Sequence, residues 1–469
     1  MALQTDGLSI TDLFIGPLYL LIFFAIAYQV RPMVTNKFTR KYFIPAFALK
    51  MVGGLGFALV FTLYYGSVDH ISGDTGNYFQ SSSVIYKAFW DSPSLGLDLL
   101  MNLDITTSEA YRYRSNLNWY NTPRNFFVIQ IASIFNLLSF NSYIGVTLFF
   151  AAASFTGIYA LYVTLIKLYP RFHKEFAIAV FFIPSLFFWG SGLMKDTICL
   201  GCIGWAFWAF YQGFIEKKKI LKSLFILFIA LGIIQIVKVY ILLCFIPAAV
   251  LWVFLENSKK IKNPIIRIIS KPILIVVGAG IGYFASTSLT EESRYSVENV
   301  AETAATTSNY LERQTLRKAG TGRRTGSEYY VGKLDGSTGS MITAAPQAIF
   351  VALFRPFIFE TRNPVMLLSA LEATWFLWLA LTAIYKIGLS KLLKFISSTP
   401  LLAFCFSFAI IFGLGVGLTS GNFGTLVRYR IPLIPFFAAA LLILKNYSKL
   451  VAPKVRKNYK KVPPNLRPV

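Results

Sequence analysis

Apolar residues run along this chain in long stretches, unlike the short periodic patterns of a soluble protein. In lipid, a chain segment satisfies its own backbone hydrogen bonds as a helix, so each long run predicts a membrane-spanning helix. The pattern predicts an all-α polytopic membrane protein with about eleven spans. We expect the spans at residues 12–30, 43–66, 143–167, 176–190, 197–214, 223–237, 241–255, 272–286, 364–385, 399–418 and 431–444.

The composition supports the same class of protein. Of the 469 residues, 55% are hydrophobic and only 14% are charged. A soluble domain carries about a quarter charged residues, so an ordinary globular protein is excluded, and the apolar content excludes disorder.

The basic residues give the expected topology. Lys and Arg number 45 against 21 Asp and Glu, a net charge of +24. More than half of the basic residues fall in alternate connections between spans and in the tail 445–469, which predicts that these parts are cytoplasmic. The N-terminus is then outside, residues 1–444 form one membrane domain, and the tail is a basic cytoplasmic extension. Because the charge is divided among short clusters, no nucleic-acid partner is expected.

Two long connections, 67–142 and 287–363, are predicted on the external side. In the first, Asp74 precedes Tyr78 by four residues, so both share a face if a helix begins at Asp74. Asp69 lies five residues earlier, and an Asp at a helix start is also a common cap. The apolar run from Phe126 to Ser139 is too short to span and predicts an interfacial or re-entrant helix. The second connection contains a basic block, residues 313–324, in a segment predicted to be a flexible flap or a solvated loop.

Several charged side chains fall at the predicted outer ends of spans. Burying a charge there is costly unless the charge has a partner or a ligand. The alternatives to ligand binding are ion pairs between neighbours, snorkelling to water, or a structural Arg–Glu pair. Outward arginines also oppose the usual charge bias, and a guanidinium binds phosphate through two parallel hydrogen bonds. The candidate substrate-binding residues are Tyr78, Asp69, Lys195, Asp196, Lys238, Arg355, Glu360, Arg428 and Arg430.

The segments 73–78 (Gly-Asp-Thr-Gly-Asn-Tyr) and 122–125 (Thr-Pro-Arg-Asn) resemble the first external loop of the GT-C glycosyltransferases. Those polytopic enzymes use polyprenyl-linked sugars. Many members carry adjacent acids or Asp-x-Asp at this point, whereas Thr75 and Gly76 follow Asp74 here, and one extra span precedes the loop. The second long external loop is similar to that of the O-antigen polymerase and ligase branch, which relies on arginines.

The resemblance implies transfer of a sugar from a polyprenyl phosphate or diphosphate, in contact with membrane lipid, to a glycan, lipid or protein acceptor. It implies the bacterial inner (plasma) membrane, with the site facing outside. Asp74 is the expected catalytic residue, either as the base or as a ligand of a divalent cation, Mg²⁺ or Mn²⁺. Tyr78 would orient Asp74, and Lys195, Arg428 and Arg430 would stabilise the departing phosphate.

Two alternatives stay open at this point. A polymerase or ligase of lipid-linked glycans would depend on Arg428, Arg430 and the block 313–324 more than on Asp74. A flippase or exporter of anionic lipid-linked substrates would need charges midway through several spans. The middles of the predicted spans are nearly free of charge, with Glu372 and Lys50, near an inner end, as the main exceptions, which favours a site at one face of the membrane.

Overall fold

The computed structural model describes residues 7–103, 108–258, 302, 304–306, 328–332, 334–361 and 364–447. Within these ranges the chain is helical, and its β-structure is limited to the isolated bridges Ser67–His70 and Glu328–Asn422. The long apolar helices are α1 (Ile10–Val34), α2 (Arg40–Leu59) continued by η1 (Val60–Tyr64), α7 (Tyr143–Leu168), α10 (Lys195–Phe210) continued by η3 (Tyr211–Ile215), α11 (Ile220–Ser258), α15 (Pro364–Ile387) and α17 (Pro400–Thr419). The other helices are α3 (Gly73–Asp91), α4 (Pro93–Leu100), α5 (Ser108–Arg114), α6 (Pro123–Leu138), η2 (Pro170–Phe172), α8 (His173–Phe181), α9 (Pro184–Phe188), α14 (Thr338–Phe354), η4 (Ile358–Glu360), α16 (Leu389–Ser398), α18 (Phe423–Tyr429), η5 (Ile431–Leu433) and α19 (Ile434–Lys445).

The described residues contain seven helices that are long and apolar enough to cross a membrane. An eighth is added if α18 and the helical segment Ile431–Lys445, which meet at a bend of 42°, count as one span. The predicted class, a helical integral membrane protein, is therefore confirmed at this level. The predicted span 272–286 and the basic tail beyond residue 447 lie outside the described residues.

The predicted span 176–190 is instead two short helices, α8 and α9. Pro184 begins α9 and has no backbone N–H to continue the hydrogen bonding of α8. The two intramembrane charges noted in the sequence serve the ends of α9. Glu372 accepts a hydrogen bond of 3.1 Å from the Ser185 backbone at its start. Lys50 donates to the carbonyls of Leu186, at 3.4 Å, and Gly190. The break between α8 and α9 removes backbone hydrogen-bond partners, and these two buried charged side chains take their place.

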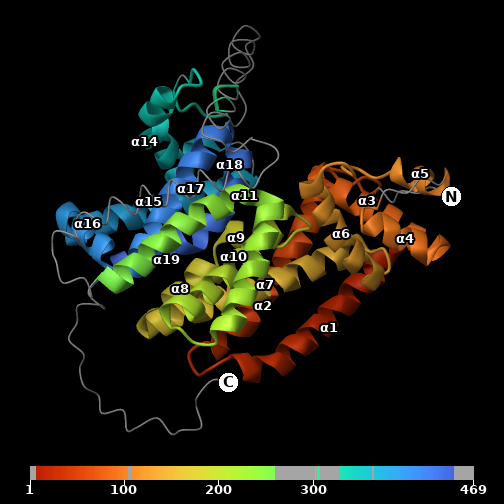
Figure 1. Cartoon of the computed structure of the whole chain (residues 1–469), viewed down its shortest axis with the longest axis horizontal. Coiled ribbons are helices and arrows are strands. Elements are labelled where there is room, and N and C mark those ends of the chain that lie inside the picture. The colour runs from red at the N-terminus through yellow and green to blue at the C-terminus, as the bar shows by residue number, and fades with distance from the viewer. Residues whose placement is uncertain are drawn as a thin grey trace.

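The two predicted spans on either side of Lys238 form one 39-residue helix, α11, with a break at this residue. Lys238 has φ −148° and ψ 77°, far from helical values, and the two halves of α11 run in different directions from the break (Figure 1). The break places one lysine at the apex of two apolar segments.

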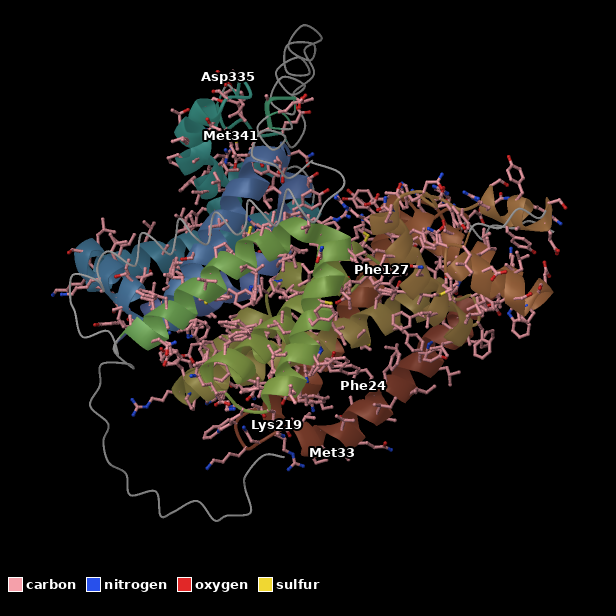
Figure 2. All side chains as sticks on the ribbon, viewed as in Figure 1. Phe24, Met33, Phe127, Lys219, Asp335 and Met341 are labelled. Carbon is pink, nitrogen blue, oxygen red and sulfur yellow. The ribbon has the colours of Figure 1, made fainter. Side chains whose placement is uncertain are left out.

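Contacts between distant parts of the sequence show that three of the basic connections, at residues 31–42, 167–175 and 215–222, lie together at one end of the helix bundle. The Tyr42 hydroxyl is 3.2 Å from Nδ1 of His173, and Lys167 forms an ion pair with Glu216. Figure 2 shows Met33 and Lys219 at this end and Asp335 at the other. We call these the basic end and the opposite end.

At the opposite end, a buried carboxylate joins the starts of two helices. Asp12 accepts hydrogen bonds from the Ser9 backbone, at 2.8 Å, and from the Ile144 backbone, also at 2.8 Å. It also accepts one from the Ser142 hydroxyl at 2.7 Å. Unpaired N–H groups at the starts of α1 and α7 are thereby satisfied by one side chain.

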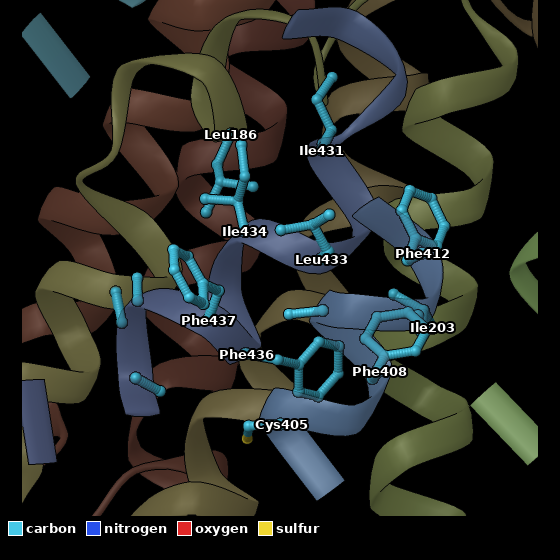
Figure 3. Close-up of a cluster of buried hydrophobic side chains, with 14 of the residues drawn as sticks. Leu186, Ile203, Cys405, Phe408, Phe412, Ile431, Leu433, Ile434, Phe436 and Phe437 are labelled. Atoms are coloured by element: carbon cyan, nitrogen blue, oxygen red, sulfur yellow. The ribbon is translucent and has the colours of Figure 1, made fainter. Parts of the chain in front are cut away.

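Two apolar cores hold the structure. The larger lies among the long helices, where Phe408, Phe412 and Phe436 meet Ile203 of α10 (Figure 3). The smaller lies mainly among α3, α4, α5 and α6, which we call the α3–α6 unit, and includes Phe79 and Ile129. The unit occupies the predicted external connection 67–142 (Figure 1). The predicted short helix 126–139 corresponds to α6, which packs against α3.

The described part of the connection 287–363 contains a helix that packs on the bundle. Its residues 338–354 form α14, which packs against α17. A Cβ added to Gly417 of α17 would lie 2.2 Å from the carbonyl oxygen of Ala348, so the two backbones approach closely because this residue is glycine. The basic block 313–324 lies outside the described residues.

Candidate functional site

Asp74 stands at the start of α3 because of the two glycines beside it. Gly73 has φ +75°, a left-handed conformation that favours glycine, and opens the turn into the helix. At Gly76, a Cβ would lie 2.0 Å from the carbonyl oxygen of Ile71, so a larger residue would push the helix start away. α3 thus begins one residue before Asp74, as the shared face of Asp74 and Tyr78 requires. The Asp74 side chain is 43% exposed.

Asp196 lies in the first turn of α10 and is buried, with 1% of its side chain exposed. It accepts a hydrogen bond of 2.8 Å from Nε of Arg428 and forms an ion pair with Lys238. A buried carboxylate needs such partners, because desolvation of a lone charge is costly. Asp196 therefore holds two cations from helices far apart in the sequence.

Lys238 reaches Asp196 from the break in α11, and its ammonium lies 4.5 Å from the centre of the Tyr429 ring. Only 7% of its side chain is exposed. In place of snorkelling to water, the alternative considered for Lys238, the side chain makes a buried ion pair and a cation–π contact.

Arg428 of α18 joins the two carboxylates. Its Nε donates to Asp196 and its Nη2 donates to Oδ2 of Asp74 at 3.0 Å. Among the described residues, Oδ1 of Asp74 accepts no hydrogen bond. One carboxylate oxygen of Asp74 is thus fixed, and the other is available to a ligand.

Lys195, beside Asp196, is half-buried and makes no hydrogen bond or ion pair with any described residue. It interacts electrostatically with Lys238, Asp74 and Arg124. It stands at the first position of α10, where the helix dipole also favours an anion. We call the five residues Asp74, Lys195, Asp196, Lys238 and Arg428 the charged cluster. Three cations against two carboxylates leave the charged cluster with an excess positive charge, which suits an anionic ligand.

Tyr78 lies one turn after Asp74 and is buried, and its hydroxyl donates to Oδ1 of Asn125 at 3.0 Å. Burial raises the pKa of Tyr78, and the nearby Asp74 raises it further. The hydroxyl therefore stays protonated and serves as a donor. No hydrogen bond joins Tyr78 to Asp74 among the described residues, so its expected orienting role would act through packing.

Four of the predicted binding residues lie apart from these contacts. Asp69 is exposed in the turn before α3 and makes no ion pair with a described residue. Arg355 pairs with Glu360, at 3.1 Å from Nε to Oε2, the structural alternative considered for these two residues. Arg430 is 1% exposed, and its Nη1 donates to the Arg355 carbonyl at 2.7 Å.

Arg430 also faces Glu372, with 3.6 Å between Nη2 and Oε1. The expected clamp of Arg428 with Arg430 is thus divided. Arg428 belongs to the charged cluster, whereas Arg430 connects α14, α15 and the bend after α18.

Two aromatic neighbours of the site did not follow from the sequence. Tyr429 supplies the ring beside Lys238, and Trp119 packs on Tyr78 with 5.0 Å between ring centres. Tyr429 could have been noted because it separates the two arginines, but Trp119 lies 41 positions from Tyr78 and had no local signal.

The side chains present do not fit a divalent cation well. Among the described residues, no group of three His, Cys, Asp or Glu side chains gathers as a metal site. Asp74 faces Arg428, and Asp196 is already bound by two cations. Positive side chains around the two carboxylates repel a metal ion, so the two carboxylates are poor ligands for Mg²⁺ or Mn²⁺.

Comparisons with protein-family models, with curated proteins and with solved structures find no match to this chain. The functional assignment therefore depends on the geometry of the charged cluster.

Proposed function

We propose that this protein is a membrane-embedded glycosyltransferase that moves a sugar from a polyprenyl-phosphate or polyprenyl-diphosphate donor to a glycan, lipid or protein acceptor. One observation carries the proposal. A half-exposed carboxylate, Asp74, stands beside Lys195, a cation without an ion-pair partner among the described residues, and beside Arg428. This combination offers a base and an anion site within one cluster.

We place the charged cluster at the external face of a bacterial inner membrane. The basic end of the bundle would lie in the cytoplasm, because Lys and Arg accumulate there. The N-terminus would then be outside and the C-terminus inside. A lipid-linked donor would reach the cluster sideways from the membrane, since its polyprenyl chain stays in lipid.

The reaction assigns a role to each side of the cluster. Oδ1 of Asp74 takes the proton from the acceptor hydroxyl, whose oxygen forms a bond to the anomeric carbon. The bond from that carbon to the donor phosphate oxygen breaks, and its electron pair stays on the phosphate. Lys195 and Arg428 stabilise the negative charge that develops there. Asp196 and Lys238 act as positioning residues that hold Arg428.

Purified full-length protein in liposomes, supplied with donors labelled in the sugar, tests this function. The donors are a polyprenyl-phosphate monosaccharide and a polyprenyl-diphosphate oligosaccharide, each with an extract of envelope glycan as acceptor. We expect label to move to the acceptor with one donor class. The proposal is wrong if no label moves with either class while labelled lipid crosses the bilayer, because transport would then be the activity.

The central place of Arg428 favours a second candidate, a polymerase or ligase of lipid-linked glycans. Among the residues that the structure describes, Arg428 is the one side chain that forms ion pairs with both carboxylates of the cluster. In that reaction the arginine holds the diphosphate and the substrate transferred is a whole glycan. Transfer that survives Asp74→Asn but is lost in Arg428→Lys would favour this candidate over the first.

A further inference from the structure

The loop between α5 and α6 contains an open cleft of about 600 Å³ on the α3–α6 unit, built from residues outside the charged cluster. Its volume lies within the range of small-molecule sites, about 300–1,000 Å³. Nothing in the proposed chemistry at Asp74 uses this cleft.

Aromatic rings and polar groups alternate along its lining. Tyr111 is 72% exposed and Trp119 is half-buried. The Arg114 guanidinium lies over the Tyr120 ring, 4.7 Å from the ring centre. Asn121 adds an exposed amide. One exposed ring, Tyr111, and one half-buried ring, Trp119, therefore line the cleft beside polar side chains.

The loop is held in place before any ligand arrives. The backbone N–H of Asn118 donates to the Ser81 hydroxyl of α3 at 2.9 Å. The N–H of Thr122 donates to the carbonyl of Trp119, also at 2.9 Å. Trp119 itself has φ +55°, a strained conformation for a bulky residue, and such strain is concentrated at binding sites.

The cleft is linked to the charged cluster through two side chains that pack on each other. Trp119 packs on Tyr78, and Tyr78 lies one helical turn, about 6 Å along α3, from Asp74. The cleft therefore lies against the helix that carries the Asp74 carboxylate.

We propose that this cleft binds a saccharide of the acceptor, an inference that rests on the proposed glycosyl transfer and names its acceptor as a glycan. The C–H faces of a sugar ring are apolar and stack on aromatic rings, while its hydroxyls need amide, hydroxyl and guanidinium partners. Trp119 and Tyr111 supply the stacking surfaces, and Arg114 and Asn121 supply the polar partners.

The test is saturation-transfer NMR of the full chain in lipid nanodiscs with three trisaccharides. The probes are maltotriose, triacetylchitotriose and trigalacturonate, which are neutral, N-acetylated and acidic. We expect one of the three trisaccharides to bind. Trp119→Ala and Tyr111→Ala should each lower the affinity for that trisaccharide about tenfold. Tyr111 is exposed, so its variant is expected to fold even if Trp119→Ala does not. Trp90→Ala is the matched control, because Trp90 is 71% exposed but lies outside the cleft.

The outcomes separate this inference from the proposed function. Asp74→Asn should bind the trisaccharide like the wild type. If the wild type binds the trisaccharide but transfers no sugar, the transfer reaction alone is refuted. The cleft assignment is overturned if no trisaccharide binds, if Tyr111→Ala binds as tightly as the wild type, or if Trp90→Ala weakens binding equally. It is also overturned if Asp74→Asn removes binding, since the saccharide would then occupy the charged cluster.

Discussion

Arg428 donates a hydrogen bond of 3.0 Å to Asp74, a residue 354 positions earlier in the sequence. The contact joins the start of α3 to α18, and the same guanidinium also holds Asp196. A half-exposed acid is thereby tied to a buried one through a single cation. The arrangement distinguishes a structural carboxylate, Asp196, from one that is available for chemistry, Asp74.

Asp196→Asn should destabilise the fold, because it leaves the buried Lys238 without its ion pair and removes one of the two carboxylates bound by the half-buried Arg428. Breaking a buried pair costs about 3–5 kcal/mol. The midpoint of thermal unfolding in detergent should therefore fall clearly below that of the wild type, and Asp196→Asn combined with Lys238→Met should recover part of the loss. The exposed Asp69→Asn is the control. Equal midpoints for Asp196→Asn and Asp69→Asn would contradict the structural role of Asp196.

Lys195→Met should weaken donor use without changing stability. Lys195 has no ion pair to lose among the described residues, so the unfolding midpoint should stay at the wild-type value. The variant loses the proposed hydrogen bond between Lys195 and the donor phosphate. Loss of a hydrogen bond to a charged group costs about 1.5–3 kcal/mol, which corresponds to a rise of roughly 10- to 100-fold in KM for the donor. Lys195→Arg should keep most of the affinity, and Lys37→Met at the basic end should keep all of it. An unchanged KM in Lys195→Met would remove Lys195 from the anion site.

Glu372→Leu should be far more damaging than Glu372→Gln. The leucine leaves the Ser185 N–H without its acceptor and the buried Arg430 without its only nearby acid within the described part of the chain, at a cost of about 3–5 kcal/mol. The glutamine keeps a carbonyl oxygen for Ser185. Thermal unfolding of both variants, with the exposed Glu109→Gln as a control, measures the difference. If Glu372→Leu unfolds at the wild-type midpoint, the bonding at the start of α9 is not needed for stability.

The proposed topology predicts opposite labelling of two introduced cysteines. Asp69 is exposed at the opposite end of the bundle and Lys219 is exposed at the basic end. In a variant lacking the four native cysteines, Asp69→Cys should react with a membrane-impermeant maleimide in intact cells. Lys219→Cys should react only after permeabilisation. The reverse result would place the charged cluster in the cytoplasm.

The sequence predicted the helical membrane class and the position of Asp74 because both depend on local pattern. Apolar runs specify helices in lipid, and the segment 73–78 carries its own helix start. It also singled out Lys195 and Lys238, since cations at apolar boundaries are conspicuous in a sequence.

The partners of these charges could not be predicted in the same way. Lys238 lies 42 positions from Asp196, and only the packing of α10 against α11 brings them together. Arg428 and Arg430 are two positions apart and looked equivalent, yet the bend after α18 gives them different neighbours. Likewise, a single lysine between two apolar runs does not reveal whether the chain forms two helices or one broken helix.

The central claim is that Asp74 performs chemistry at a site where other residues bind the donor. The most direct test compares wild type, Asp74→Asn and Asp69→Asn in liposomes, measuring donor binding and sugar transfer on the same preparations. The account predicts that Asp74→Asn binds donor within about threefold of wild type and loses transfer by about 100-fold or more, as expected for loss of a general base, while Asp69→Asn keeps both. Transfer by Asp74→Asn at the wild-type rate, with donor bound equally well, would contradict it.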